Sequence, residues 1–198
     1  MKYTLFLFAI LFYSSINGQN TEAVNLPYHQ IPEYPGDYTS GNVISRFIDG
    51  LGYRYYWATE GLREEDLSYK PSDDSRDALH TLNHLHGLSQ TILNGAKDVA
   101  NVRPANAPEL TFEELRAKTL QNFKEASELA LGKDATQIAE LSIIFQRGEN
   151  KNEFPFWNMM NGPIADAIYH VGQIVAFRRA SGNPINPGVN VFIGKTKE

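Results

Sequence analysis

Apolar residues recur at helical spacing in four segments of this chain of 198 residues. The repeat i, i+3, i+4, i+7 predicts amphipathic helices over residues 42–61, 75–93, 111–132 and 163–182. In the first helix, the residues expected to face inward are Ile44, Phe47, Ile48, Leu51, Tyr55, Ala58 and Leu62. Four such helices in one chain predict an all-α fold, a four-helix up-down bundle.

Several residues mark the ends of these helices. Thr111 and Glu114 have the spacing of a capping box at the start of the third helix, and Gly132 ends it. Pro163 suits the first turn of the fourth helix, and Gly182 suits its end. Inside the first helix, Gly50 and Gly52 weaken the pattern and indicate a close helix crossing.

The segments outside the helices are expected to be irregular or extended. Residues 19–40 are rich in Pro, Tyr and Asn and predict an extended N-terminal arm. Residues 63–74 and 94–108 are predicted loops, and 183–198 is a predicted extended C-terminal tail.

Residues 133–160 fit two alternatives. Leu141, Ile143 and Phe145 alternate with other residues, and 147–152 is rich in turn-forming residues. These features predict a short hairpin before the last helix, but a broken helix fits the same residues.

The first eighteen residues have the pattern of a signal peptide. Lys2 provides the charged start, and the apolar run over 5–13 is too short to span a bilayer as a helix. The expected division is a signal peptide over 1–18, an arm over 19–40, a helical bundle over 41–182 and a tail over 183–198. We therefore expect a secreted or periplasmic protein.

Charge and composition exclude several classes of function. The formal net charge is −5 and no basic tract is present, which argues against nucleic-acid binding. No second apolar run reaches membrane length, so no stable membrane insertion is expected. Because the chain contains no Cys, a tight metal site has to use His, Asp or Glu.

The fourth helix carries an unusual polar stripe. Between Pro163 and Phe177 it has no Lys, Arg or Glu, and its strong polar side chains are Asp166, His170 and Gln173. Asp166 and His170 are four residues apart and share a face, so both side chains can reach one metal ion. The simpler alternative is a surface Asp–His pair.

The second helix carries a further pair of histidines, His80 and His84, also four residues apart. His84 lies on the flank of the apolar stripe, and His80 lies nearer the helix start. Without a metal, His84 is a histidine at the edge of the core and His80 a solvent-exposed one. His86 is expected to pack against the core, and His29 in the arm carries no spacing signal.

His84, Asp166 and His170 together form a predicted three-ligand site with open coordination positions. This donor set suits Zn, Ni, Fe or Mn, and donor type alone does not select among these divalent metals. His80 is the alternative that substitutes for Asp166 or joins it.

The first helix also contains a cluster of aromatic residues, Tyr53, Tyr55, Tyr56 and Trp57. Adjacent helical positions cannot all face one core, so we expect these rings to pack beneath the arms. Lining of a pocket or an interface is the alternative.

Three segments of the chain resemble the DinB-like (YfiT-like) superfamily of metal-binding four-helix bundles. These segments are residues 53–62, 82–88 and 168–174. The resemblance implies that His84, Asp166 and His170 are the metal ligands, with Asp166 where the family typically has His. Val171 stands where the family frequently has Arg.

The resemblance implies a metal-dependent enzyme that acts on a small-molecule substrate of unknown identity. A hydrolase is the first expectation and a transferase the second, with Glu60 or Tyr56 as residues that would face the site. The alternatives are a non-catalytic module that binds a small molecule and a homodimer formed by helix pairing. If the protein forms a homodimer, we expect an exposed apolar strip on the first helix.

Overall fold

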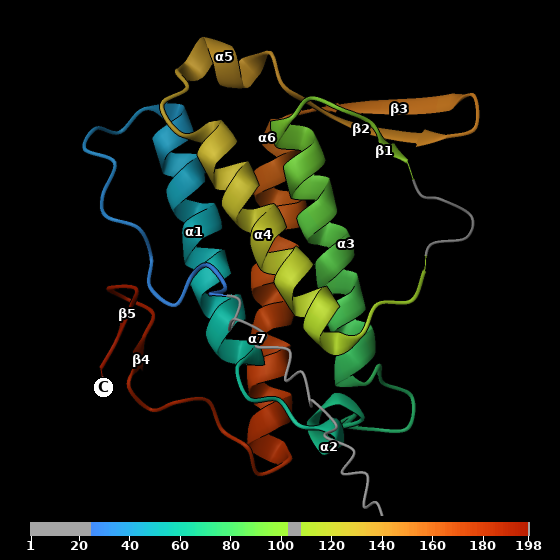
Figure 1. The fold of residues 1–198 in the computed structure, drawn as a ribbon. Helices are drawn as coiled ribbons and strands as arrows, with labels where there is room; N and C mark the ends of the chain where they lie inside the picture. The colour runs from blue at the N-terminus through green and yellow to red at the C-terminus, as the bar shows by residue number, and fades with distance from the viewer. Residues whose placement is uncertain (1–24, 103–107, 198) are drawn as a thin grey trace, which may run out of the picture.

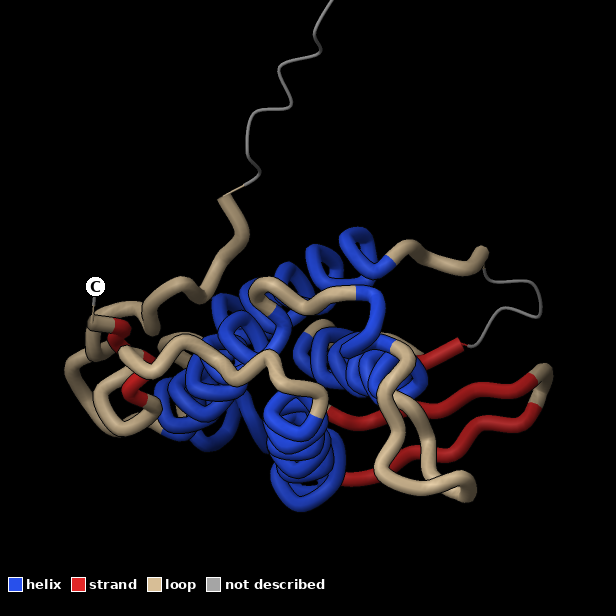
Figure 2. The backbone as a smooth tube through the Cα atoms, turned by 90° about the horizontal axis from the view of Figure 1, so that it is seen from below, coloured by secondary structure: helices blue, strands red, loops and turns tan. Residues whose placement is uncertain are grey.

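The protein is described by a computed structural model over residues 25–102 and 108–197, so the predicted signal peptide lies outside the described residues. The described residues are mostly helical, with a few short strands (Figure 1). The long helices are α1 (Ser40–Thr59), α3 (Ala78–Ala96), α4 (Phe112–Ala130) and α7 (Ala165–Ala180). Figures 1 and 2 show them side by side, and each of the four predicted helices is present.

The capping residues explain where these helices begin. Thr39 and Asp77 accept backbone N–H groups at the starts of α1 and α3. The predicted capping box of α4 is confirmed, since Thr111 and Glu114 each bind the backbone of the other.

Shorter helices lie in the segments that join the long ones. Residues 63–74, predicted as a loop, contain α2 (Glu64–Leu67), and α5 (Ala135–Ala139) follows α4. Two short elements precede α7, namely α6 (Trp157–Met159) and a π-helix, η1 (Met160–Ile164), which contains Pro163. Gly162 in η1 has non-helical backbone angles that mark a kink, and Ile164 is already helical, so the helix that continues into α7 begins just after Gly162, in agreement with the predicted start at Pro163.

The hydrogen bonds between helices show their relative directions. His86 of α3 bonds to Thr119 of α4, and Ser89 bonds to Asn122, so both helices advance by three residues between contacts and run parallel. In contrast, the first turn of α1 lies beside the end of α4, where Gly41 N donates to Lys133 O at 2.9 Å. In an up-down bundle each long helix runs antiparallel to the one before it. The pair α3 and α4 does not follow this prediction.

The length of the connection explains this parallel pair. A helix of 19 residues such as α4 is about 28 Å long, at about 1.5 Å per residue. Residues 97–111 join α3 to α4, and at about 3.3 Å per extended residue this segment can span the length of a helix. Short loops would instead favour antiparallel neighbours.

The predicted hairpin before the last helix is confirmed. Strands β2 (Ser142–Arg147) and β3 (Asn150–Pro155) pair antiparallel, with Ser142 opposite Pro155. Strand β1 (Asn101–Val102) adds to β2 in parallel and gives the order β1-β2-β3. The C-terminal tail, predicted as extended, folds back on itself through a second short pair, β4 (Val189–Asn190) and β5 (Lys195–Thr196).

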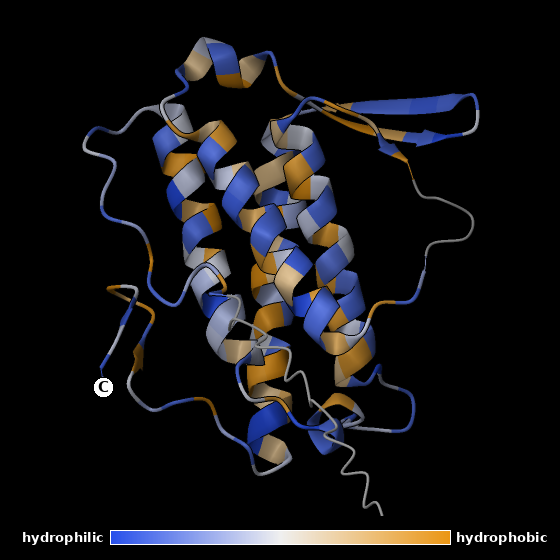
Figure 3. Ribbon diagram, in the orientation of Figure 1, coloured by the Kyte–Doolittle hydropathy of each residue, from blue (hydrophilic) through white to orange (hydrophobic). Residues whose placement is uncertain are grey.

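Apolar residues from all four long helices form the core. Each helix carries both apolar and polar residues (Figure 3). Fully buried side chains include Ile48, Leu51, Leu82, Leu85, Leu120, Phe123 and Ile174. Phe47, predicted to face inward, is 51% exposed, so that prediction was wrong. No helix among the described residues has the length and apolarity needed to cross a membrane.

Tyr53 and Trp57 of the aromatic cluster pack beneath the two arms, as expected, whereas Tyr55 lies in the main core beside Phe123. The hydroxyl of Tyr53 bonds to Thr196 in the C-terminal hairpin at 2.8 Å. The indole N–H of Trp57 donates to the carbonyl of His29 in the N-terminal arm at 3.2 Å. These contacts tie both terminal segments to the same helix.

Candidate metal centre

The candidate centre lies between α3 and α7. His84 is in the second turn of α3, one residue before the fully buried Leu85. That position puts the imidazole on the flank of the buried face, where it is partly exposed, as the sequence predicted. Helix α7 runs alongside and brings two ligand residues to the same place.

Asp166 and His170 are one turn apart on α7. Asp166 lies in the first turn of α7, near the start of the helix, where the helix dipole favours a carboxylate. The π-helix that precedes α7 fixes where this first turn falls, and π-helical turns are frequent at functional sites.

The three side chains converge although 82 residues separate His84 from Asp166. One ligand atom from each residue lies within 4.8 Å of the others. Asp166 bridges the two imidazoles, with Oδ2 3.1 Å from His84 Nε2 and Oδ1 3.4 Å from His170 Nε2. The two rings are perpendicular, with centroids 4.7 Å apart.

Gln173 orients the imidazole of His170. Its Oε1 lies 2.7 Å from His170 Nδ1, and a carbonyl oxygen can only accept, so Nδ1 carries the proton. In the neutral ring, Nε2 then holds a lone pair that points toward the Asp166 carboxylate. These two electron-rich atoms, 3.4 Å apart, can both bind one metal ion.

The distances agree with what one ion would require. Two ligand atoms bound to a tetrahedral ion at about 2.0–2.1 Å are about 3.3–3.4 Å apart. The separations of 3.1 and 3.4 Å from the two oxygens of Asp166 to the imidazoles lie close to that value, and one ligand atom from each of the three residues lies within 4.8 Å of the others. Nitrogen and carboxylate oxygen donors suit Zn, Ni, Fe or Mn, so the residues present fit a divalent metal.

The centre is open to solvent. The side chains of His84 and Asp166 are 36% and 42% exposed, whereas His170 is 16% exposed. The polar stripe of α7 therefore lies at the protein surface beside α3, rather than deep inside the helices. Three protein ligands with an exposed side leave room for water or a substrate.

Other residues considered from the sequence lie elsewhere. His80 is bonded through Nδ1 to Asp77 at 2.8 Å, is 75% exposed, and is not part of the cluster. His86 points to the opposite side of α3, where Nδ1 lies 3.1 Å from Thr119 Oγ1 and burial lowers the pKa of the imidazole. His29 packs on the rings of Tyr56 and Trp57.

The two residues expected to face the site, Glu60 and Tyr56, interact with α4 instead. Glu60 pairs with Arg116, and the Arg116 guanidinium lies over the Tyr56 ring at 4.8 Å from its centroid. The structure therefore places neither residue beside the ligand cluster.

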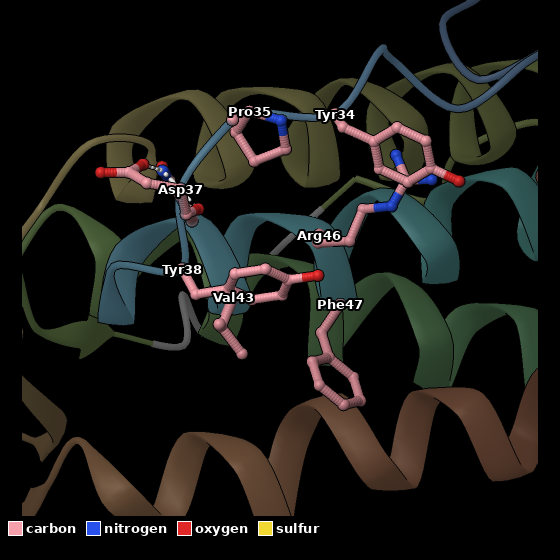
Figure 4. Close-up of a pocket in the computed structure, with 9 residues that line it drawn as sticks. Tyr34, Pro35, Asp37, Tyr38, Val43, Arg46 and Phe47 are labelled. Carbon is pink, nitrogen blue, oxygen red and sulfur yellow. Dashed lines mark hydrogen bonds between the residues drawn. The ribbon is translucent and has the colours of Figure 1, made fainter.

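A first cavity, about 620 Å³, lies between the N-terminal arm and the first turns of α1 (Figure 4). It is lined by Tyr34, Pro35, Gly36, Asp37, Tyr38, Asn42, Val43, Arg46 and Phe47. The second cavity, about 400 Å³, lies between the arm, α1 and α4. None of the three candidate ligands lines either cavity.

Sequence analysis missed one polar pair at the second cavity, Tyr28 and Asp49. The Tyr28 hydroxyl donates to Asp49 Oδ1 at 3.0 Å, and Asp49 is only 6% exposed. Tyr28 has a φ of +73°, a conformation that costs a bulky residue on the order of 1–3 kcal/mol. The signal that could have found the site is the small and polar stripe Ser45, Asp49 and Gly52, spaced i, i+4, i+7 on α1.

Comparisons of the chain with family models, with curated proteins and with solved structures found no match. The geometry of the described residues is therefore the basis for the function proposed below.

Proposed function

We propose that His84, Asp166 and His170 bind one divalent metal ion in a protein of the DinB-like four-helix-bundle class. The observation that carries the proposal is the convergence of three ligand atoms within 4.8 Å from helices distant in sequence. A surface Asp–His pair within α7 would need no third partner, but His84 supplies one from α3. Asp166 in place of the family's His adds a negative charge that favours a divalent cation.

Each residue of the centre has a separate role in binding the ion. His84 and His170 present Nε2, and Asp166 presents its carboxylate between them. Gln173 accepts a hydrogen bond from Nδ1–H of His170 and so keeps Nε2 free for binding. The exposed side of the centre gives a small substrate access to the ligands.

We propose a metal-dependent hydrolase as the activity, with a transferase second. A bound divalent ion would supply Lewis acidity toward a polar bond of the substrate. No side chain beside the cluster is assigned as general base. The signal peptide over 1–18 and a secreted or periplasmic location remain part of this proposal, and the mass of the mature protein tests them.

The deciding experiment is the metal content of the untagged protein, purified without chelators, by elemental mass spectrometry. We expect about one metal ion per chain, lost in His84→Ala, Asp166→Ala and His170→Ala. His80→Ala is the matched control, because it removes an exposed histidine from the same helix, and it should retain the metal. Wild-type protein that stays metal-free after incubation with Zn, Ni, Fe and Mn would refute the proposal.

The second candidate is a dimerising module, and the exposed face of α7 favours it. Ala165, Tyr169, Gly172 and Ala176 share this face and are all exposed, with Tyr169 at 65%. The strip expected on the first helix is short, because only Val43 and Phe47 of its apolar residues are exposed. Sedimentation of wild type and Tyr169→Lys tests pairing, with Leu131→Lys as a control at another exposed apolar side chain.

A further inference from the structure

The second cavity contains a polar site on elements that contribute nothing to the metal centre. Its walls are the N-terminal arm, α1 and α4, and its volume of about 400 Å³ is in the range of small-molecule sites. Tyr28 fastens the arm over it through Asp49. The Tyr28 ring occupies the space beside Gly52, where an added Cβ would lie 2.4 Å from a ring carbon.

Asp49 is the central polar group of this cavity. Its side chain is almost fully buried, and burial raises the pKa of its carboxyl group. Oδ1 accepts one hydrogen bond, from Tyr28. Hydrogen bonding from the Ser127 hydroxyl also stabilises the Asp49 carboxylate, and the side chain of Asp49 lines the cavity.

The cations near Asp49 are engaged elsewhere. Arg46 donates to the carbonyl of Pro32 at 2.8 Å, and its guanidinium lies over the Tyr34 ring (Figure 4). Lys124 pairs with Glu128 one turn along α4. Within the described part of the chain, no ion pair joins either cation to Asp49, although Arg46 lowers the pKa of Asp49 from a distance.

The carboxylate that the arm contributes to the cavity, Glu33, has a partner. Glu33, which lines the cavity, lies 3.5 Å from Lys195 in the C-terminal hairpin. Among the described residues, Asp49 is therefore a buried carboxylate without an ion pair. A buried charge is costly unless it is paired and hydrogen-bonded.

Two hydroxyl groups lie beside Asp49. Ser45 Oγ and Ser127 Oγ are 2.7 Å apart and line the same cavity. A hydroxyl oxygen accepts as well as donates, so this pair can accept an N–H from a ligand. On the arm side, Pro27, Pro32 and Pro35 provide apolar walls.

We propose that this cavity binds a small organic ammonium ion. The ammonium group donates to Asp49 Oδ2 and to a serine hydroxyl, and its short alkyl chain lies along the prolines. An anion would face the uncompensated carboxylate, and a neutral alcohol would leave its charge unpaired. The ammonium ion supplies a positive charge that pairs directly with the Asp49 carboxylate.

The test is a titration of the purified ¹⁵N-labelled protein with n-butylammonium, followed by amide chemical shifts. n-Butanol and butyrate serve as neutral and anionic probes of the same length. We expect saturable shifts at Tyr28, Ser45, Asp49 and Ser127 with the ammonium probe, and a dissociation constant at least tenfold weaker for the other two.

Two variants assign the binding to this carboxylate. Asp49→Asn keeps an acceptor for Tyr28 but removes the charge, and it should weaken ammonium binding at least tenfold. Asp74→Asn removes an exposed carboxylate and should leave binding unchanged. His84→Ala should also leave it unchanged, which separates this site from the metal centre. No saturable ammonium binding, or equal binding in Asp49→Asn with a native spectrum, would overturn the proposal.

Discussion

The Oε1 atom of Gln173 lies 2.7 Å from Nδ1 of His170, one turn further along α7. This contact fixes which ring nitrogen of His170 is free to bind a metal ion. Partners of this kind commonly change metal affinity by about 10–100-fold when they are removed. Gln173 is therefore a positioning residue for the candidate centre.

We expect Gln173→Ala to weaken metal affinity by about 10–100-fold, because His170 loses the acceptor that orients it. Gln173→Glu should retain or strengthen the affinity, because a carboxylate accepts the hydrogen bond from Nδ1–H more strongly than an amide does. Competition with a coloured chelator measures both effects. Gln90→Ala, at an exposed position of α3, is the control. If the metal affinity of Gln173→Ala equals that of the wild type, Gln173 does not position His170 for metal binding.

Asp66 should make the protein sensitive to acid. It is buried and accepts hydrogen bonds from Arg63, from Ser181 at 2.5 Å and from Asn183 at 2.6 Å. The bonds from Arg63 are the main cause that holds the pKa of Asp66 well below its usual range. Stability from Asp66 is thus present above its unfolded pKa and is lost as pH falls through the lower folded pKa.

The variant Asp66→Asn should lower the free energy of unfolding by about 2–4 kcal/mol at pH 7. Below about pH 4, where the Asp of an unfolded chain becomes protonated, the stability of this variant should fall less steeply with pH than that of the wild type. Urea unfolding at several pH values measures both effects, with the exposed Asp74→Asn as the control. Parallel pH profiles for Asp66→Asn and wild type would contradict the assignment.

Asp49 should have the opposite pH dependence. Burial is the largest cause of its raised pKa, so its contribution to stability is present below the unfolded pKa and is lost as pH rises through the folded pKa. At pH 7 we expect Asp49→Asn to stabilise the protein on the order of 1 kcal/mol, or about 2–4 °C in Tm. Calorimetry at pH 4 and 7 tests this, and a lower Tm at pH 7 would show that the charge is compensated.

Gly52 should be required for docking of the N-terminal arm. A Cβ at this position would lie 2.4–2.7 Å from three carbons of the Tyr28 ring, and the strained backbone of Tyr28 leaves the ring little freedom to move. We expect Gly52→Ala to destabilise the protein and to expose Tyr28, as measured by Tm and by tyrosine fluorescence.

The control for this substitution is Gly87→Ala in α3, where an added Cβ meets no atom within 4 Å. Alanine should stabilise that helix by about 0.5–1 kcal/mol. Equal effects of the two alanine substitutions would show that Tyr28 does not need the space beside Gly52.

Gly52 also shows where a pattern was interpreted wrongly. Gly50 and Gly52 of α1 predicted a close crossing of helices, but the ring that approaches Gly52 comes from the N-terminal arm. A glycine in a helix predicts that something lies close to the backbone, and it does not say what. Similarly, periodicity placed Phe47 inward, whereas only the position of the arm and the neighbouring helices decides which edge of an apolar face is covered.

The sequence by itself determined the local features of this protein. Helical periodicity, the capping box at Thr111 and the alternation around Ile143 depend on neighbouring residues, so the four long helices and the hairpin could be predicted. The pairing of Asp166 with His170 is equally local, because one helical turn separates them.

Only the tertiary structure decided which distant residues meet. The parallel course of α3 and α4, the 3.1 Å approach of His84 to Asp166 and the burial of Asp49 beneath Tyr28 join segments far apart in the chain. Such contacts depend on how whole helices pack and on where the connections return. Spacing along a helix shows which side chains share a face, but packing determines what that face meets.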